Sequence, residues 1–396
     1  MGTVACVYAV GLSDYALERK LPSGSTAFSQ AVGAARGLPD VERWVLLSDR
    51  DPADFDGHWP ADFGPVEKAG CRDVGEIMEA LRGIGEGADH LFFLWGDEPI
   101  VDPELSRRMY ERHVKYFSSY TFADGFPMGL APEIIRNDTL GQLAELAHRH
   151  SGSVTPGRTM IFDVVQKDIN AFDLETEVAP RDLRLHRVLL AADTRRNFLL
   201  LEGVMKQGGT DAESVMEVVE NRQEVLRTLP AYLQVQVTEG CPQSCSYCPY
   251  PRMAVGDVRE LTGQMDPERW QALLDDAEGY CDDLVVGIGL WGEPSLHDNI
   301  AEMVETALSH QKFRVVIETS GVGWIADDLR RIAGLDTSRI DWIVSLDAET
   351  EDTYRKLRGP QWDEARAAVA MMRELFTDEK VHVQTVRMKE KDRKST

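Results

Sequence analysis

Three cysteines stand close together in the middle of the chain, in the sequence CPQSCSYC. Cys241, Cys245 and Cys248 are spaced C-x3-C-x2-C, directly after a short apolar run. Three thiolates on one tight loop can bind three irons of a 4Fe–4S cluster and leave the fourth iron open to another ligand. A structural zinc site would need a fourth protein ligand, and neither Cys281 nor His297 lies at zinc-site spacing from this loop. We therefore expect an iron–sulfur cluster here, with zinc or merely buried thiols as the alternatives.

A regular alternation of strands and helices begins at these cysteines and fills the rest of the chain. The predicted strands are residues 233–238, 284–290, 314–319, 342–347 and 381–387, and the predicted helices are residues 266–278, 299–309, 326–332 and 363–376. Five successive strand–helix steps indicate most of a barrel wall, in which active sites lie at the carboxyl ends of the strands. The charged tail KEKDRKST follows without a sixth strand, so residues 381–387 are expected to be an open edge.

The segment from about 232 to 388 resembles the radical S-adenosylmethionine (SAM) enzymes. Their signature is C-x3-C-x-aromatic-C, and Tyr247 fills the aromatic position. Gly292, Glu293 and Pro294, in GLWGEPSLH, are similar to the family's GGEP segment, which holds the methionine amino group; Trp291 replaces its first glycine. IETSG is similar to the TNG segment, and SLDAETEDTYRKLRG and VQTVRMKE resemble segments of radical SAM enzymes that carry a carboxy-terminal SPASM extension. Within that subgroup the chain is most similar to the spiro-SPASM proteins.

The resemblance implies roles for several polar residues in holding SAM. Glu293 is the candidate acceptor for the SAM ammonium, because an ionised carboxylate beside an ammonium forms a charge-assisted hydrogen bond. Ser345 and Asp347 alternate along a predicted strand and therefore share a face, where they could meet the ribose hydroxyls. Arg358 is a candidate donor to the SAM carboxylate. The alternatives are that Asp347 caps the following helix and that Arg358 is solvated or structural.

The function implied by the resemblance is reductive cleavage of SAM. An electron from a reduced 4Fe–4S cluster would yield a 5′-deoxyadenosyl radical, which abstracts hydrogen from a substrate of unknown class. Relatives with SPASM extensions often modify peptides, so the substrate could be a peptide; that extension is absent here, so the chain is a fragment or its target differs. The alternatives are a nucleotidyltransferase with a regulatory iron–sulfur half and a non-catalytic metal-binding scaffold.

The first 200 residues resemble the sugar cytidylyltransferase type of nucleotidyltransferase. VYAVGLSDYALERKLPSGSTAF stands where that family has its glycine-rich phosphate loop, and WGDEPIVDPELSRRM is similar to the segment whose aspartate binds the metal. The phosphate loop needs several glycines for backbone N–H groups to approach the phosphates, but only Gly11 is present in its core. We therefore expect a nucleotidyltransferase-like fold that has lost catalysis. Asp97 and Asp173 are the candidate metal ligands if it has not, and surface or turn carboxylates if it has.

Length and composition limit the remaining possibilities. The chain has 396 residues, 43% of them hydrophobic, which suffices for two or three domains. Its net charge of −24 argues against a nucleic-acid-binding protein and against a basic membrane-surface protein. Neither a signal peptide nor an apolar run of ~18 residues stands out, so we expect a cytoplasmic protein without membrane partners.

These observations together predict an α/β protein of two domains. Residues 1–207 are expected to form the nucleotidyltransferase-like α/β sandwich and residues 208–230 a linker helix. Residues 231–396 are expected to form a partial (β/α)6 radical SAM barrel that stops before the sixth strand and any SPASM extension. The expected partners are the substrate and a reducing electron donor. Cys6, Cys71 and Cys281 are isolated in the sequence and are expected to be core or inert thiols.

Overall fold

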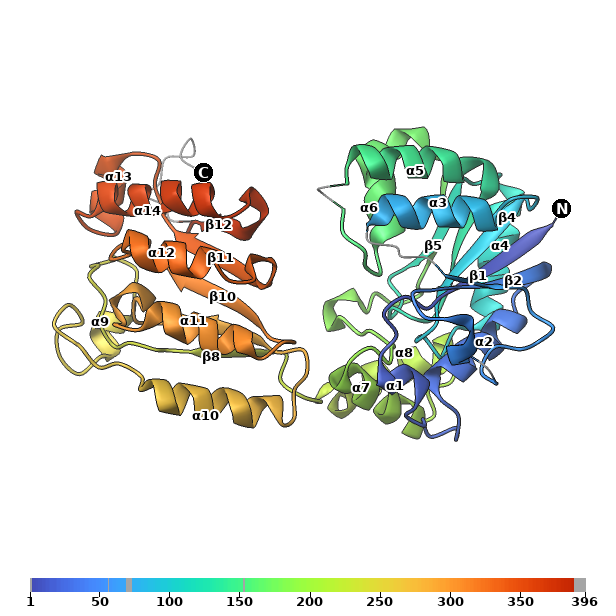
Figure 1. Ribbon diagram of the computed structural model, residues 1–396, viewed down its shortest axis with the longest axis horizontal. Coiled ribbons are helices and arrows are strands. Elements are labelled where there is room, and N and C mark those ends of the chain that lie inside the picture. Colours follow the sequence, from blue (N-terminus) through green and yellow to red (C-terminus); the bar gives the residue numbers. More distant parts are fainter. Residues whose placement is uncertain (1, 56, 69–72, 152–153, 388–396) are drawn as a thin grey trace. The chain divides into compact units, whose positions relative to one another are not determined.

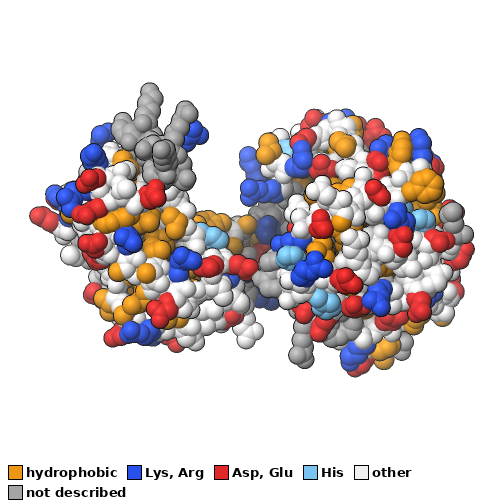
Figure 2. Space-filling model, turned by 90° about the horizontal axis from the view of Figure 1, so that it is seen from above, with side chains coloured by type: hydrophobic (Ala, Val, Ile, Leu, Met, Phe, Trp, Pro, Cys, Tyr) orange, Lys and Arg blue, Asp and Glu red, His pale blue; other side chains and the backbone are white. Residues whose placement is uncertain are grey.

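The computed structural model describes the chain except for residues 1, 56, 69–72, 152–153 and 388–396, and Cys71 therefore lies outside the described residues. The chain divides into two compact units, Met1–Thr228 and Leu229–Thr396 (Figure 1). Each unit is a sheet covered by helices, so the predicted α/β fold is confirmed. Acidic and basic side chains are interspersed over the face of each unit seen in Figure 2.

The amino-terminal unit contains a seven-stranded mixed sheet in the order β3-β2-β1-β4-β6-β5-β7. Strand β6 is antiparallel to β4 and β5, and the other neighbours are parallel. Tyr8 at the end of β1 pairs with Trp95 at the end of β4, so the loops that follow these strands are neighbours. The strands are β1 (Thr3–Tyr8), β2 (Val41–Ser48), β3 (Val66–Lys68), β4 (His90–Trp95), β5 (Tyr120–Asp124), β6 (Glu133–Arg136) and β7 (Leu174–Val178).

Helices cover both faces of this sheet, which explains why β1 is apolar at every position from Val4 to Tyr8. One core contains side chains of α2, α4, α7 and α8, and the other contains side chains of α3, α5 and α6. Cys6 is buried in the second core, as expected for a core thiol. The helices are α1 (Asp14–Leu17), α2 (Ala27–Arg36), α3 (Val74–Ile84), α4 (Pro103–Lys115), α5 (Leu140–Arg149), α6 (Met160–Val165), α7 (Arg195–Lys206) and α8 (Ala212–Asn221).

Helix α8 differs from the expected linker. Val215, Met216 and Val219 on its apolar face are buried in the core that α7 also joins. Its first turn is bound as well, because the backbone N–H of Ala212 donates to the carboxylate of Asp102 at 2.7 Å. The helix therefore belongs to the amino-terminal unit, and the chain divides at Thr228 and Leu229 rather than across a linker at 208–230.

Two buried histidines in this unit predict how its stability depends on pH. His113 on α4 lies 3.2 Å from His90 and 2.8 Å from the hydroxyl of Thr121. Burial, followed by the neighbouring His90, lowers the pKa of His113 to about 3. Because the unfolded chain takes up this proton near pH ~6.5 and the folded chain does not, acidification favours unfolding.

We therefore expect the free energy of unfolding to fall by about 2 kcal/mol more in the wild type than in His113→Gln between pH 7 and pH 5. Urea denaturation of both proteins at the two pH values measures this difference. Comparison with the variant cancels the contributions of the other titrating groups. An identical pH dependence in the two proteins would contradict the prediction.

The carboxy-terminal unit contains five parallel strands in the order β12-β11-β10-β9-β8, which is the sequence order of a barrel wall. Strands β8 and β12 form its edges, so the described part of the predicted last strand is an open edge. The strands are β8 (Tyr232–Val235), β9 (Val285–Ile288), β10 (Arg314–Thr319), β11 (Ile340–Ser345) and β12 (Val381–Gln384).

The four longest helices of this unit lie in a row along the sheet (Figure 1). They share one apolar core with the strands, which includes Trp270, Trp342 and Cys281. The helices are α9 (Tyr250–Met253), α10 (Pro267–Glu278), α11 (Ile300–Ser309), α12 (Ala326–Ala333), α13 (Glu351–Leu357) and α14 (Trp362–Leu375). None of the helices in the described parts of the chain has the length and apolar character needed to cross a membrane.

Candidate functional site

The three cysteines lie on the loop between β8 and α9, at the carboxyl end of the first strand. All three are partly exposed, and none forms a disulfide. Backbone hydrogen bonds fix the loop to the segment after α13: Ser244 donates to the carbonyl of Arg358 at 3.0 Å, and Ser246 donates to that of Leu357 at 2.8 Å. The loop therefore keeps its conformation through contacts that do not involve the thiols.

A buried ion pair lies beside this loop. The side chains of Asp347 and Arg358 are 1% and 7% exposed, with Arg358 Nη1 2.5 Å from the Asp347 carboxylate. Tyr247, between the second and third cysteines, donates its hydroxyl to Asp347 and accepts from Arg358 Nη1 at 2.8 Å. Arg358 Nε donates to Gln243 at 2.9 Å, and Gln243 donates to the hydroxyl of Tyr354 at 2.6 Å. We call these five residues the Arg358 clasp.

These contacts bear on the alternatives given above for Asp347 and for Arg358. Asp347 does not cap the following helix, because Thr350 is the N-cap of α13 and the second oxygen of Asp347 accepts from the backbone N–H of Val386 at 2.6 Å. Arg358 is buried and not solvated. Ser345 lies at the end of β11 opposite Gln384 of β12, and its role toward a ribose stays a prediction.

Glu293 connects three loops at the same end of the sheet. It follows β9, is 3% exposed, and donates its backbone N–H to the carbonyl of Gly240 at 2.7 Å. Its carboxylate accepts from the hydroxyl of Thr319, the last residue of β10, at 2.5 Å and from the backbone N–H of Ser320, the next residue, at 2.8 Å. Burial raises the pKa of Glu293, and these hydrogen bonds oppose the rise. The segments singled out after β9 and β10 are thus in direct contact.

The neighbours of Glu293 have steric reasons for their identity. A Cβ at Gly292 would lie 1.7 Å from the carbonyl oxygen of Thr238, so only glycine permits this approach of the β9 loop to the end of β8. Pro294 is buried and begins a short 3-10 turn, Pro294–Leu296. Trp291, in place of the first glycine of the segment, packs edge-on against Tyr250 with ring centroids 5.5 Å apart.

The donor set of the cysteine loop fits an iron–sulfur cluster. Burial raises the pKa of Cys241 to about 12, and the adjacent thiols Cys245 and Cys248 contribute to the rise, so the three groups lie within electrostatic reach of one another. Within the described residues, no three His, Cys, Asp or Glu side chains converge tightly enough to hold one metal ion. Thiols that bind different irons of one cluster stand further apart than the ligands of a single ion. Three thiols on one loop are a donor set that can hold three irons of a cluster.

The predicted metal site of the amino-terminal unit is occupied by an arginine. Arg158 donates to both oxygens of Asp97, at 3.0 and 2.6 Å, and to Glu98 at 2.8 Å and Asp193 at 3.3 Å. Its guanidinium also lies 4.7 Å from the Trp95 ring. The carboxylates that could face a divalent cation are therefore neutralised by an internal cation, and this site does not fit a metal.

Asp173 is not part of this cluster. It precedes β7, is exposed, and its backbone groups bond to Ser119. Asp193, which precedes α7 and which sequence reasoning did not single out, is the carboxylate that joins Asp97. The loop after β1 also lacks a phosphate cradle, because the N–H of Gly11 donates to the carboxylate of Asp49 at 3.2 Å.

Comparison with known proteins gives a family match within the carboxy-terminal unit. Residues 235–394 match the family model of the Radical SAM superfamily. An uncharacterized protein of Treponema pallidum (strain Nichols) is 30% identical over 215 residues, which cover 52% of this chain and 58% of that protein. The chain thus spans somewhat more than half the length of that relative.

Two solved structures show weak overall similarity. A cytidylyltransferase from Leptospira borgpetersenii serovar Hardjo-bovis (strain JB197) matches with a TM-score of 0.46 and 14% identity, over 57% of this chain and 96% of that one. Streptococcus suis SuiB bound to S-adenosylmethionine matches with a TM-score of 0.35 and 17% identity, over 45% of this chain and 40% of that one.

Proposed function

We propose, because residues 235–394 match the family model of the Radical SAM superfamily, that this protein binds a 4Fe–4S cluster and cleaves SAM reductively. The resulting 5′-deoxyadenosyl radical would abstract hydrogen from a substrate. The observation that carries the proposal is the convergence of separate motif segments on one loop. Glu293 after β9 bonds to Gly240, and Arg358 after α13 bonds to Gln243 and Tyr247, so both contact the segment that carries the three cysteines.

The chain's own residues would bind and orient the cofactors. Cys241, Cys245 and Cys248 would hold three irons, and the bound cluster and SAM together supply the one-electron chemistry. Glu293 would accept from the SAM ammonium. Arg358 uses Nε and Nη1 within the clasp, and its guanidinium would also donate to the SAM carboxylate. Burial of both residues strengthens such contacts.

The test of this function is anaerobic reconstitution of the full chain with iron and sulfide, followed by dithionite and SAM. We expect 5′-deoxyadenosine to form, and to form only when reductant, SAM and cluster are all present. Cluster-free protein is the control. A fully reconstituted protein that binds SAM and yields no 5′-deoxyadenosine would contradict the proposal.

The proposal extends to the substrate and the electron donor. The resemblance to SPASM-type enzymes supports a peptide substrate, and the chemistry requires a reducing electron donor. A cytoplasmic location stays a prediction. The rival nucleotidyltransferase activity is disfavoured, because Arg158 occupies the acidic site and Gly11 is bonded to a carboxylate.

Exchange of Glu293 for glutamine separates SAM binding from cluster binding. Glu293→Gln keeps the shape but removes the charge, so a charge-assisted bond to the ammonium becomes a neutral one. We expect a loss of about 1–2 kcal/mol, or roughly 5–30-fold weaker SAM affinity, with the iron content unchanged. Calorimetric titration of the reconstituted protein measures the affinity.

The matched control is Glu302→Gln, on the exposed side of α11, which should leave SAM affinity unchanged. Glu293 also holds Thr319 and Ser320, so thermal unfolding of the variant must be recorded beside the titration. SAM affinity equal to that of the wild type in a folded Glu293→Gln protein would leave Glu293 with a structural role only.

A further inference from the structure

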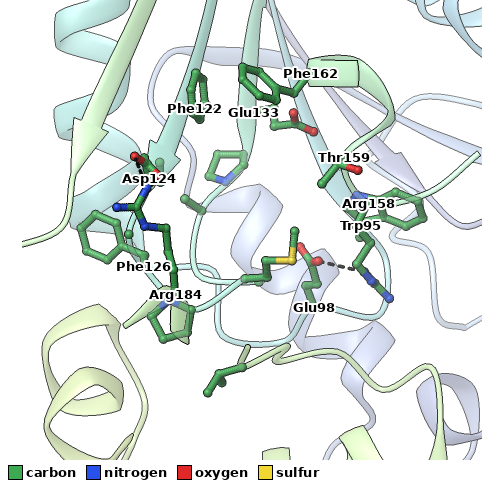
Figure 3. Close-up of a pocket in the computed structure, with 18 of the residues that line it drawn as sticks. Trp95, Glu98, Phe122, Asp124, Phe126, Glu133, Arg158, Thr159, Phe162 and Arg184 are labelled. Atoms are coloured by element: carbon green, nitrogen blue, oxygen red, sulfur yellow. Dashed lines mark hydrogen bonds and ion pairs between the residues drawn. The ribbon is translucent and has the colours of Figure 1, made fainter. Parts of the chain in front are cut away.

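A pocket opens beside Arg158 in the amino-terminal unit (Figure 3). Its volume of about 480 Å³ suits a small organic molecule. The ends of β4 and β5, the start of β6 and the loop between β5 and β6 form most of its wall, and segments near residues 158–162 and 183–188 complete it. The large apolar side chains of the lining are Trp95, Tyr120, Phe122, Phe126, Met128 and Phe162.

Three aromatic rings stand in a row along one side of this pocket. Tyr120 and Phe122 alternate along β5 and stack with their centroids 5.4 Å apart. Phe162 of α6 follows, with its centroid 5.0 Å from that of Phe122 and its ring plane tilted by 47°. An apolar ligand could pack against Phe122 and Phe162, and the faces of the rings would attract a cation.

Glu133 lies in the pocket wall next to these aromatic rings (Figure 3). Its carboxylate accepts from the hydroxyl of Tyr120, and within the described residues no lysine, arginine or histidine forms an ion pair with it. Burial raises the pKa of Glu133 to about 7, and the nearby Asp163 adds to the rise. An ionised carboxylate among aromatic rings loses the solvation that water gives it. A cationic ligand would offset this desolvation cost.

The charges around the pocket favour a cation over an anion. Arg158 is already paired with Asp97, Glu98 and Asp193. Arg184 is paired with Asp124 at 3.3 Å and with Asp182 at 2.7 Å. Arg187, the third arginine of the lining, is exposed. The guanidinium groups of Arg158 and Arg184 are thus already paired with carboxylates and are not open to an anionic ligand, whereas Glu133 has no ion pair within the described residues.

We propose that this pocket binds a small organic amine carried on an aromatic or other flat apolar body. The ring would lie against Phe122 and Phe162, and the ammonium would pair with Glu133. Glu98 lines the same cavity from a different wall, where Arg158 holds it (Figure 3). This site needs no metal and does not depend on the proposed radical SAM function.

The experiment compares probes that differ only in charge. The full chain is titrated calorimetrically at pH 8, above the pKa of Glu133, with 2-phenylethylamine, the neutral 2-phenylethanol and the anion 3-phenylpropionate. We expect the amine to bind at least about tenfold more tightly than the alcohol, and the anion to bind most weakly. Glu133→Gln should bring the affinity for the amine close to that for the alcohol.

The matched control is Glu67→Gln on β3, outside the pocket, which should keep the preference for the amine. If Glu133→Gln fails to fold, as judged by circular dichroism, Phe162→Leu replaces it and should weaken both the amine and the alcohol. Equal binding of amine and alcohol, no binding of any of the three probes, or an amine preference that survives in a folded Glu133→Gln would each overturn the proposal. Tighter binding of cytidine triphosphate with Mg²⁺ than of the amine would do so as well.

Discussion

Replacing Cys241, Cys245 and Cys248 together by alanine should abolish cluster binding. The reconstituted wild type should carry about four irons per chain, and the triple variant close to none. The physical reason is that these thiolates are the soft ligands on the loop after β8, whereas Ser244 and Ser246 hold the loop through backbone bonds that the substitutions leave intact. Analysis of iron and sulfide, with the EPR spectrum of the reduced protein, measures the effect.

The control for this prediction is a cysteine of the same unit. Cys281 is 1% exposed in the apolar core and its thiol lies 3.5 Å from the carbonyl oxygen of Pro230. Cys281→Ala should therefore keep the full iron content, with at most a modest loss of stability from the small cavity. A full cluster in the triple variant, or its loss in Cys281→Ala, would show that the ligands are assigned wrongly.

Local patterns predicted the parts of the site that each lie within one short segment. The spacing of Cys241, Cys245 and Cys248 requires no tertiary information, and neither does the alternation of five apolar runs with helices. The Gly–Glu–Pro segment was recognisable too, although its steric reason, the contact of Gly292 with the carbonyl of Thr238, needs the fold.

Contacts between distant segments could not be predicted. Gln243 reads as an ordinary polar loop residue and Tyr354 as an ordinary helix residue, yet both belong to the Arg358 clasp. The positive φ of 62° at Asp347 has no local sequence signal either. Such features depend on which loops the sheet brings together.

The same limit applies to the acidic residues of the amino-terminal unit. Asp173 is exposed, in agreement with its interpretation as a surface or turn carboxylate, whereas Asp193 precedes an ordinary helix and was not singled out from the sequence. The fold nevertheless places Asp193 beside Arg158 and Asp97. The glycines before helix α8 suggested a linker. The helix instead belongs to the amino-terminal unit, because its apolar face is buried against α7.

Removal of Arg358 should destabilise the carboxy-terminal unit strongly. Arg358→Met takes the cation from a buried pair and leaves the Asp347 carboxylate, which is 1% exposed, without its guanidinium partner. We expect a loss of about 3–5 kcal/mol in the free energy of unfolding, because breaking one side of a buried pair uncovers the full desolvation cost of the other. Urea denaturation followed by tryptophan fluorescence measures it.

A matched exposed pair and a double variant test whether burial is the cause. Arg355 and Glu351 form an ion pair on the exposed side of α13, so Arg355→Met should cost no more than about 0.5 kcal/mol. Asp347→Asn combined with Arg358→Met should be less destabilised than the sum of the two single variants, because neither charge is then left alone. Asparagine tolerates the left-handed backbone of this position, so the substitution does not add strain. If Arg358→Met cost as little as Arg355→Met, or if the double variant were strictly additive, the buried Asp347–Arg358 pair would not be the source of this stability.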